Sequence, residues 1–290
     1  MKKRVVILGS NGFVGSNIIK NLDPNIYAPI SVARNECDFS SEESRNKLSK
    51  IIQDGDIIVC AAAKAPAKNL EMLTENVAII TNIAEALRTK KISYLLNISS
   101  DAVYADSMDK ISESSEVAPL SAHGIMHCMR EYILEKRIDA PVGHLRSTLI
   151  FGEGDPHNGY GPNSFIRLAQ AANPISLFGN GEEQRDHIYV GDVAKIAISM
   201  ISKKQTGAVN AVRGKTISFM EIAELVKKSS AKPIEIICKP RSGPMPHNGY
   251  RAFTNDKILE ILPGFKYKEI SDYIKEMVQN NASVQLAESA

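Results

Sequence analysis

An excess of charge of either sign and paired cysteines are both missing from this sequence. Its 290 residues carry 35 Lys+Arg against 33 Asp+Glu, so the formal net charge is only +2. A balance this even argues against a nucleic acid or a membrane surface as the main partner. The four cysteines show no paired spacing (Cys37, Cys60, Cys128 and Cys238). They are typical of free thiols, and we expect a protein of the reducing cytoplasm.

Long hydrophobic runs, internal repeats and low-complexity segments are also absent. The chain begins with the basic run Met1–Arg4, and the apolar residues that follow soon reach a glycine. This run is too short for the hydrophobic region of a signal peptide or for a membrane-spanning helix. With 43% hydrophobic and 23% charged residues, the composition is that of a soluble globular protein of one large domain or two smaller ones.

What the sequence does contain is a glycine motif directly after a buried strand. The apolar run Val5–Leu8 predicts the strand, and Gly9, Gly12 and Gly15 follow it. Apolar residues at helical spacing come next. A strand, a turn and a helix in this order place a pyrophosphate against backbone N–H groups at a helix N-terminus. In this interpretation Gly9 permits the tight turn, Gly12 lets the phosphate approach, and Gly15 lets the helix pack closely on the strand.

The spacing of these glycines leaves an alternative open. The usual dinucleotide fingerprint is G-x-G-x-x-G, whereas here successive glycines are three residues apart. A tight turn without any ligand has the same pattern. The position at the start of the chain and the strong strand before it favour the dinucleotide site.

The first half of the chain alternates short apolar runs with helical patterns. Strands separated by helices predict right-handed crossovers and a parallel sheet covered on both faces. We therefore predict an α/β fold, with a doubly wound parallel sheet of the Rossmann type that binds NAD(P) over residues 1–150. Pro29 argues against a central position for its strand. The expected strands after the first are 26–32, 56–60, 94–98 and 142–145, and the expected helices are 41–52, 70–88 and 121–137.

After Phe151 the pattern becomes less regular. Residues 152–163 carry Gly, Pro, Asp and Asn, which mark a loop. We assign residues 151–280 mainly to a smaller α/β substrate-binding lobe, with part of 187–204 returning to the first domain. The polar residues 281–290 are expected to form a frayed tail. Helices of this second half are expected over 164–172, 193–201 and 219–229.

A series of motifs, in order along the chain, resembles the extended short-chain dehydrogenase/reductases of the NAD-dependent epimerase/dehydratase family. Gly9-Ser10-Asn11-Gly12-Phe13-Val14-Gly15 resembles their glycine motif, and Ser99-Ser100-Asp101-Ala102-Val103-Tyr104 resembles their catalytic-serine segment. Their substrate-lobe signature is similar to Phe178-Gly179-Asn180-Gly181 followed by Arg185-Asp186-His187-Ile188-Tyr189-Val190-Gly191-Asp192. The resemblance covers nearly the whole chain. It implies that the cofactor is contacted by Gly9, Asn11, Gly12, Phe13, Val14, Gly15, Asp38, Phe39, Ala61, Ala62, Ala63 and Asn76.

The resemblance implies an NAD(P)-dependent enzyme that acts on a nucleotide-activated sugar by hydride transfer at a sugar carbon, usually C4. In the family a Tyr-x-x-x-Lys pair supplies the acid/base, and a serine, here Ser100, binds the sugar oxygen. A homodimer is also implied, because two long helices of the family, here 70–88 and 121–137, often pair into a four-helix interface. The substrate-binding residues that the resemblance implies are Ser100, Asp101, Asn163, Arg185 and Arg251.

The acid/base pair itself is replaced in this sequence. The family's frame Pro-x-Ser-x-Tyr-Gly-x-x-Lys-x-x-x-Glu is matched over residues 119–131, but His123 stands at the tyrosine position and His127 at the lysine position. Tyr132 and Lys136 form another Tyr-x-x-x-Lys, which we reject. Tyr132 follows His123 by nine residues and falls on the opposite face of the helix, where we expect a half-buried packing residue.

Histidine can transfer the proton without a lysine, because its pKa is near 6.5 whereas that of tyrosine is about 10. We predict Ser100, His123 and His127 as catalytic residues, with His123 as the acid/base and His127 also binding the nicotinamide ribose. The alternative is a catalytically silent scaffold that senses NAD(P). A third interpretation makes the two histidines half of a zinc site; no third ligand is evident, and we predict no metal.

The sequence defines cofactor preference and substrate contacts less sharply. Arg34 follows the second strand and suits the 2′-phosphate of NADP, so we favour NADP over NAD; a merely solvated arginine is the alternative. Arg185 is predicted to grip the substrate phosphates, with a local ion pair to Asp186 as the alternative. His187 is expected to be a strand residue and not a catalyst. A single acid follows Ser100, which favours an epimerase or ketoreductase over a dehydratase.

Overall fold

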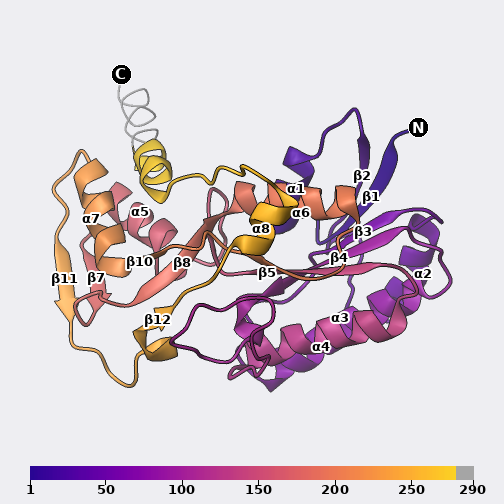
Figure 1. The fold of residues 1–290 in the computed structure, drawn as a ribbon, viewed down its shortest axis with the longest axis horizontal. Coiled ribbons are helices and arrows are strands. Elements are labelled where there is room, and N and C mark those ends of the chain that lie inside the picture. The colour runs from indigo at the N-terminus through magenta and orange to yellow at the C-terminus, as the bar shows by residue number, and fades with distance from the viewer. Residues whose placement is uncertain (279–290) are drawn as a thin grey trace.

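A six-stranded parallel sheet forms the centre of the larger domain in the computed structural model, which describes residues 1–278 (Figure 1). Its strand order is β2-β1-β3-β4-β5-β9, and every neighbouring pair is parallel. β2 lies at the edge, the position where Pro29 is tolerated in a sheet. The strands are β1 (Lys3–Leu8), β2 (Tyr27–Val32), β3 (Ile57–Cys60), β4 (Tyr94–Ser100), β5 (Val142–Ser147) and β9 (Gly207–Ala211).

Helices cover both faces of this sheet, as Figure 1 shows. On one face α1 (Phe13–Asn21) packs against α6 (Val190–Lys203). On the other face α3 (Leu70–Leu87) lies between α2 (Glu43–Ile51) and α4 (Ala122–Arg137). The side chains of β1 point alternately into the two hydrophobic cores that result, and each buried aliphatic side chain stabilises the fold by about 1.5–3 kcal/mol. The predicted doubly wound Rossmann-type sheet is confirmed.

The smaller α/β lobe, on the left of Figure 1, contains short strands and the helices α5 and α7, and helical residues 270–278 also pack into its core. Its main sheet has the order β10-β8-β12 with β6 also pairing with β8, and a second sheet pairs β11 with β7. The rings of Tyr160, Phe165 and Phe219 contact one another in its core. The elements are β6 (Leu149–Phe151), α5 (Pro162–Gln170), β7 (Ile175–Phe178), β8 (Gln184–Tyr189), β10 (Thr216–Ser218), α7 (Phe219–Ser229), β11 (Ile236–Lys239), η2 (Pro246–Gly249) and β12 (Tyr250–Arg251).

The chain returns to the larger domain over a longer stretch than the sequence indicated. The return was expected within residues 187–204, but β9 continues it and forms the sixth strand of the large sheet. α8 (Asp256–Ile261) returns a second time and packs on α6 and β9. The run Gly207–Ala211 is too short and too small in side-chain volume to be recognised, so only its pairing with β5 makes it a strand. The tail predicted at 281–290 lies outside the described residues.

Two differences from the expected elements bear on the site. β4 continues to Ser100 and β5 to Ser147, so both strands carry polar residues to the carboxyl edge of the sheet. Tyr132 was expected to be half-buried, but 63% of it is exposed, with the ammonium group of Lys136 above its ring. That expectation was wrong because the outer face of α4 points to solvent at this position.

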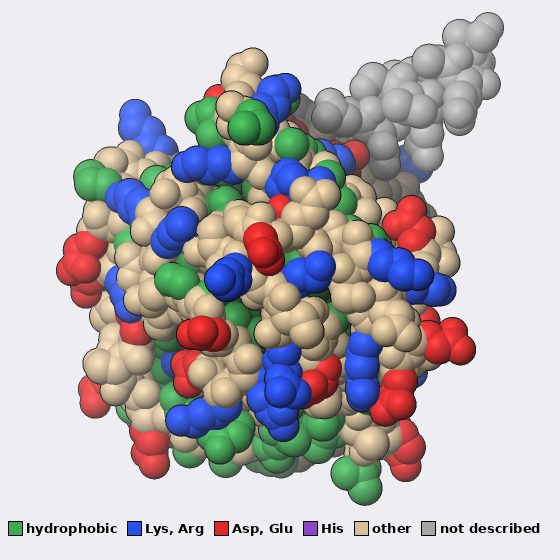
Figure 2. Space-filling model, turned by 90° about the vertical axis from the view of Figure 1, so that its right-hand side faces the viewer, with side chains coloured by type: hydrophobic (Ala, Val, Ile, Leu, Met, Phe, Trp, Pro, Cys, Tyr) green, Lys and Arg blue, Asp and Glu red, His purple; other side chains and the backbone are tan. Residues whose placement is uncertain are grey.

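The distribution of charged side chains on the surface agrees with the nearly balanced charge of the chain. Figure 2 shows basic and acidic side chains interspersed over one face, with hydrophobic side chains gathered along its lower rim, on the side where α3 and α4 lie. Among residues 1–278 no helix is both long and apolar enough to cross a membrane.

Candidate active site

Two cavities meet at the carboxyl edge of the large sheet. The larger, of about 770 Å³, is walled by the glycine turn after β1, the end of β4, the start of α4 and several segments of the lobe. The smaller, of about 290 Å³, is lined by the residues that follow β1, β2 and β3. Gly12, Ala61 and Ala63 line both, so the two cavities can hold one extended ligand. Five of the six histidines of the sequence line the larger cavity: His123, His127, His157, His187 and His247.

The glycine turn has the backbone that a dinucleotide needs. Gly9 has a φ of +87°, and a Cβ there would lie 2.7 Å from the backbone nitrogen of Ala62. A Cβ at Gly15 would lie 2.4 Å from the carbonyl oxygen of Gly9, so α1 packs closely on the turn. Gly12 is the N-cap of α1. The N–H groups of the first turn of α1 have no partner within the helix and suit a pyrophosphate.

The smaller cavity is lined by most of the residues expected to contact the cofactor. Asp38 is exposed, and hydrogen bonds from the hydroxyl of Ser40 (2.7 Å) and its backbone N–H (3.1 Å) hold the pKa of its carboxyl below the usual value. The carboxylate is therefore ionised and can accept a hydrogen bond from the amino group of an adenine, the contact that the resemblance implies for Asp38. The predicted residues that line this cavity are Gly9, Asn11, Gly12, Arg34, Asp38, Phe39, Ala61, Ala62 and Ala63. Phe13, Val14 and Gly15 line the larger cavity instead.

Two cations stand at the smaller cavity. Arg34, whose side chain is 70% exposed, forms an ion pair with Glu75 at 3.3 Å. Lys64 lines the same cavity and pairs with the same carboxylate. Lys64 was not among the predicted cofactor residues, because it stands in a loop outside every motif. Because Arg34 and Lys64 share the single carboxylate of Glu75, a net positive charge remains beside the cavity for a ligand phosphate.

Asn76, predicted as a cofactor contact, lines neither cavity. Its buried amide donates to the carbonyl oxygens of Lys64 at 2.9 Å and Met72 at 2.8 Å, and accepts from the N–H of Lys64 at 2.9 Å. These bonds tie the loop after β3 to α3. Asn76 therefore shapes the loop that carries the alanines and does not itself face the cofactor space.

The start of α4 is held against the end of β4. Ser121 caps α4, and its hydroxyl accepts a hydrogen bond from the N–H of Gly124 at 3.1 Å. Gly124 touches the segment after Ser100, since a Cβ there would lie only 2.1 Å from the carbonyl oxygen of Ala102. His123, next to Gly124, lines the same cavity as Ser100.

Glu131, the last position of the motif frame, anchors α4 from within the core. Its buried carboxylate accepts from Arg146 at 3.0 and 2.6 Å and from the hydroxyl of Ser99 at 2.6 Å. Burial raises the pKa of Glu131, but the hydrogen bonds and charge of Arg146 outweigh it and hold this pKa below the usual value. Removing one partner of a buried ion pair costs about 3–5 kcal/mol. Glu131 therefore ties α4 to β4 and β5.

The two histidines that replace Tyr and Lys lie together. Their ring centroids are 4.7 Å apart at an interplanar angle of 87°. Burial lowers the pKa of both, with Asp101 opposing this for His123, and with His123 and Arg130 adding to it for His127. The pKa of His123 therefore lies below the ordinary value of about 6.5, and both imidazoles are neutral at pH 7. The Nδ1 atoms of both rings are buried without a hydrogen-bond partner within residues 1–278.

A buried cation lies next to His127. Arg130, one turn further along α4, is 1% exposed. It donates to the carbonyl oxygen of Ala62 at 2.8 Å and to the Oδ1 atom of Asn97 at 3.1 Å, both neutral acceptors. We did not predict Arg130, because it stands three residues past the lysine position, at a place where the motif frame specifies no residue type. It supplies a positive charge near the place where the family's lysine is replaced.

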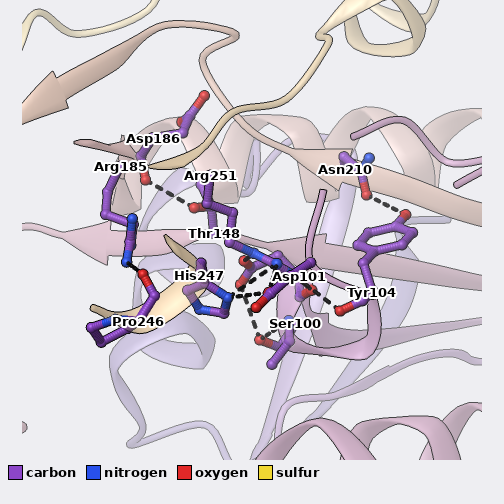
Figure 3. A network of polar contacts seen from close by, with 12 residues as sticks. Ser100, Asp101, Tyr104, Thr148, Arg185, Asp186, Asn210, Pro246, His247 and Arg251 are labelled. Carbon is purple, nitrogen blue, oxygen red and sulfur yellow. Dashed lines mark hydrogen bonds and ion pairs between the residues drawn. The ribbon is translucent and has the colours of Figure 1, made fainter. Parts of the chain in front are cut away.

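A polar network joins Ser100 to the lobe (Figure 3). The hydroxyl of Ser100 accepts from the N–H of Ala102 at 3.2 Å and lies 3.4 Å from the Oδ1 atom of Asp101. Arg251 on β12 donates to Asp101 at 2.7 Å and to Asp106 at 3.0 Å. His247 on η2 also bonds Asp106. Asp106 and His247 were not predicted, since only the folded chain brings the loop after β4 to η2.

The predicted substrate residues all line the larger cavity, but the lobe already binds some of them. Arg185 pairs with Glu183 and donates to the carbonyl oxygen of Pro246 at 2.6 Å. The alternative of a pair with Asp186 is wrong, because adjacent strand residues point to opposite faces. Asn163 donates to the carbonyl oxygen of Gly152 at 2.7 Å. The lining residues among those predicted are Ser100, Asp101, Asn163, Arg185 and Arg251.

Comparison with known proteins identifies the family. The sequence profile of the NAD dependent epimerase/dehydratase family matches residues 5–212. The chain belongs to this family. A putative UDP-glucose 4-epimerase of Methanocaldococcus jannaschii is 29% identical over 301 residues, which cover 94% of the chain and 97% of that protein. These matches confirm the family predicted from the motifs. They also confirm the prediction that the protein is an enzyme of this family.

Two solved structures show the same fold along almost the full length of the chain. The UDP-N-acetylglucosamine 4-epimerase of Methanobrevibacter ruminantium, in complex with UDP-N-acetylmuramic acid, is 23% identical with a TM-score of 0.80, covering 98% of this chain and 100% of that one. The UDP-glucuronic acid 4-epimerase of Bacillus cereus, in complex with UDP-glucuronic acid and NAD, is 18% identical with a TM-score of 0.82, covering 97% and 99%.

The histidines of this family member do not gather into a metal site in the described chain. Within residues 1–278 no group of three or more His, Cys, Asp or Glu side chains is placed to hold a metal ion. The pair His123 and His127 therefore stands without a third ligand there.

Proposed function

We propose that this enzyme acts on a nucleotide sugar by NAD(P)-dependent hydride transfer at C4, with His123 in the place of the family's tyrosine. The observation that carries the proposal is position: His123, His127 and Ser100 line one cavity together with the glycine turn at Gly12. The relatives named above are described as 4-epimerases of UDP-sugars, which makes a UDP-hexose the first substrate class to test.

The residues present fit the cofactor. When bound, NAD(P) would supply the hydride acceptor and donor for the sugar carbon. The first turn of α1 offers N–H groups to the pyrophosphate, and Gly12 leaves room for its approach. Asp38 suits the adenine, and His127, in the wall of the larger cavity, would bond the ribose of the nicotinamide half.

His123 carries the proton in this proposal. Because its imidazole is neutral at pH 7, it accepts the proton of the sugar hydroxyl as that carbon becomes a carbonyl, and returns the proton in the reverse step. Ser100 hydrogen-bonds the same sugar oxygen. Burial, together with the neighbouring His123 and Arg130, lowers the pKa of His127, and its neutral ring is free to bind a ribose hydroxyl.

An epimerase or ketoreductase is favoured over a dehydratase by the state of Asp101. This is the one acid directly after Ser100, and it is paired with Arg251 at 2.7 Å. An acid held in an ion pair is a poor proton donor for the loss of water. The conversion of UDP-glucose to UDP-galactose is therefore the first reaction to assay.

The test is substitution of His123 with the pH profile as the readout. His123→Phe is expected to lower kcat about 10²–10⁴-fold and to leave cofactor affinity nearly unchanged, as for a lost acid/base. Since burial lowers the pKa of His123, wild-type activity is expected to rise with pH through an ionisation below 6.5 and to stay level above it. His127→Ala is expected to weaken cofactor binding more than it alters the pH profile.

A matched variant restores the pair typical of the family. His123→Tyr alone is expected to be nearly inactive at pH 7, because a phenol with a pKa of about 10 needs a cation close by. Adding His127→Lys is expected to recover activity. Full activity in His123→Phe would remove the catalytic assignment. A wild-type protein that binds nucleotide sugars but never reduces its NAD(P) would make the sensor the better hypothesis.

Three further parts of the proposal concern the whole protein. We propose a modest preference for NADP, supported by Arg34 and Lys64 at the smaller cavity. We propose a homodimer through α3 and α4, supported by apolar side chains on their outer faces, among them Ile125, which is 40% exposed, and Tyr132. We also propose a cytoplasmic location, supported by four cysteines that form no disulfide.

A further inference from the structure

His187 is a polar residue in the wall of the larger cavity that the proposed mechanism does not use. It lies in the middle of β8 and is 2% exposed. Neither of its ring nitrogens makes a hydrogen bond of good geometry with any group of residues 1–278. Buried polar atoms in proteins nearly always have a partner, and leaving one without it is destabilising.

The ring of His187 borders the larger cavity with both of its nitrogens buried. The ring of Phe219 packs against it, with centroids 5.7 Å apart at an angle of 89°. The Nε2 atom faces Gly161, where a Cβ would lie 3.6 Å away, and Gly161 also lines the cavity. Nε2 is covered in the free protein, and a ligand hydroxyl reaches it by displacing the backbone at Gly161, which carries no side chain there.

The ring is neutral at physiological pH. Burial lowers the pKa of His187 to about 4, and the nearby carbonyl of Arg185 opposes this only in part. A neutral imidazole has one N–H donor and one nitrogen that accepts. If the N–H faces the Arg185 carbonyl, the other nitrogen is an acceptor, which suits a hydroxyl group and not a phosphate oxygen.

The register of β8 places the ring along the expected ligand. Arg185 pairs with Arg251 of β12, inside the lobe. Two residues on, His187 points to the same face and pairs with Leu149 of β6, which follows β5 of the large sheet closely. His187 therefore lies between the arginine pair and the domain that carries Ser100 and His123. A sugar that reaches those two residues passes this position.

We propose that His187 accepts a hydrogen bond from a hydroxyl of the sugar ring and selects nucleotide sugars that carry this hydroxyl. The inference rests on the proposed function, since it takes the ligand of the larger cavity to be a nucleotide sugar. It makes His187 a specificity-determining residue that acts in binding, separate from proton transfer at His123.

The test compares UDP-glucose with UDP in calorimetric titrations of the full chain with cofactor present. His187→Phe keeps a ring but removes both nitrogens, and it is expected to weaken UDP-glucose about 5- to 30-fold, the range for one lost hydrogen bond in a buried site. Affinity for UDP is expected to stay within about twofold. His187→Gln, whose amide can take the place of Nε2, is expected to recover much of the loss.

Deoxy derivatives of UDP-glucose identify the hydroxyl. One of the 2-, 3-, 4- and 6-deoxy sugars is expected to bind wild type and His187→Phe equally, because its partner for His187 is already gone. A second measurement needs no variant: the ¹⁵N resonance of the His187 Nε2 atom is expected to shift on addition of UDP-glucose and not of UDP. This readout holds even if His187→Phe does not fold.

The outcomes separate this inference from the proposed function. The role of His187 would be overturned if His187→Phe lowered the affinities for UDP and UDP-glucose equally, or lowered neither. The proposed function would still stand in that case, provided that wild type binds UDP-glucose. The role of His187 would also be overturned if His187→Phe bound every one of the deoxy sugars more weakly than wild type does. A shift of the ¹⁵N resonance on addition of UDP would overturn it as well. If wild type binds no nucleotide sugar in the screen, both proposals fail together.

Discussion

Gly124→Ala tests whether close contact between α4 and the end of β4 sets the catalytic geometry. The added Cβ would lie 2.1 Å from the carbonyl oxygen of Ala102 and 2.8 Å from the Cβ of Pro119. Carbon and oxygen atoms in such contacts lie about 3.3–3.6 Å apart. The first turn of α4, which carries His123, must therefore move away from the segment after Ser100 by about 1 Å.

Gly124→Ala is expected to have two opposing effects on the free energy of unfolding and a single, unfavourable effect on catalysis. Alanine is a better helix former than glycine by about 1 kcal/mol, whereas overpacking of this kind costs about 1–3 kcal/mol. The free energy of unfolding is thus expected to fall by no more than about 2 kcal/mol. A displacement of 1 Å between catalytic groups can cost about 100-fold in rate, so kcat is expected to fall by about that factor.

The assay is the steady-state conversion of UDP-glucose to UDP-galactose, with thermal unfolding measured in parallel. The matched control is Lys136→Ala, on the exposed face of the same helix, which also removes the second Tyr-x-x-x-Lys of the sequence. It is expected to keep wild-type kcat. Wild-type kcat in Gly124→Ala would refute the reasoning, and loss of activity in Lys136→Ala would reinstate Tyr132.

The remaining predictions concern the cofactor and the quaternary structure. Gly12→Val has an allowed backbone, with its Cβ 3.1 Å from the Gly9 carbonyl, and is expected to fold while losing about 100-fold in NAD(P) affinity, because its side chain enters the phosphate space. Unchanged affinity in the folded variant would contradict the phosphate site. Arg34→Ala is expected to reduce the ratio of NADP to NAD affinity in calorimetry, and an unchanged ratio would show that Arg34 is merely solvated beside Glu75. Sedimentation is expected to show a dimer at micromolar concentration that Tyr132→Glu weakens, whereas a monomeric wild type would contradict the interface.

Much of the larger domain could be predicted from local patterns. Val5–Leu8 is apolar at every position because both faces of a central parallel strand are buried, and this makes such strands visible in a sequence. The structural roles of the glycines were predictable for a similar reason, because each one meets a steric requirement of the turn. β9 escaped recognition because five small residues become a strand only beside β5.

Residues of the site were predictable only where they lie within a recognisable sequence motif. His123, His127 and Ser100 could be placed by register within two motifs, and they line one cavity. Asn76 lies in a motif as well, but its side-chain amide hydrogen-bonds the backbone of the loop after β3. A motif names a position, whereas the hydrogen bonds around it decide whether the side chain faces a ligand.

The sequence by itself determined the doubly wound sheet, the phosphate turn and the family, since each depends on periodicity or on residues close together in the chain. Only the tertiary structure decided the rest of the site. It brought Asp106 to His247 and Arg251, set Arg130 behind His127, and turned His187 into the cavity without a partner. These pairings join residues far apart in sequence, and burial, which exists only in the folded chain, lowers the pKa of the histidines on which the chemistry depends.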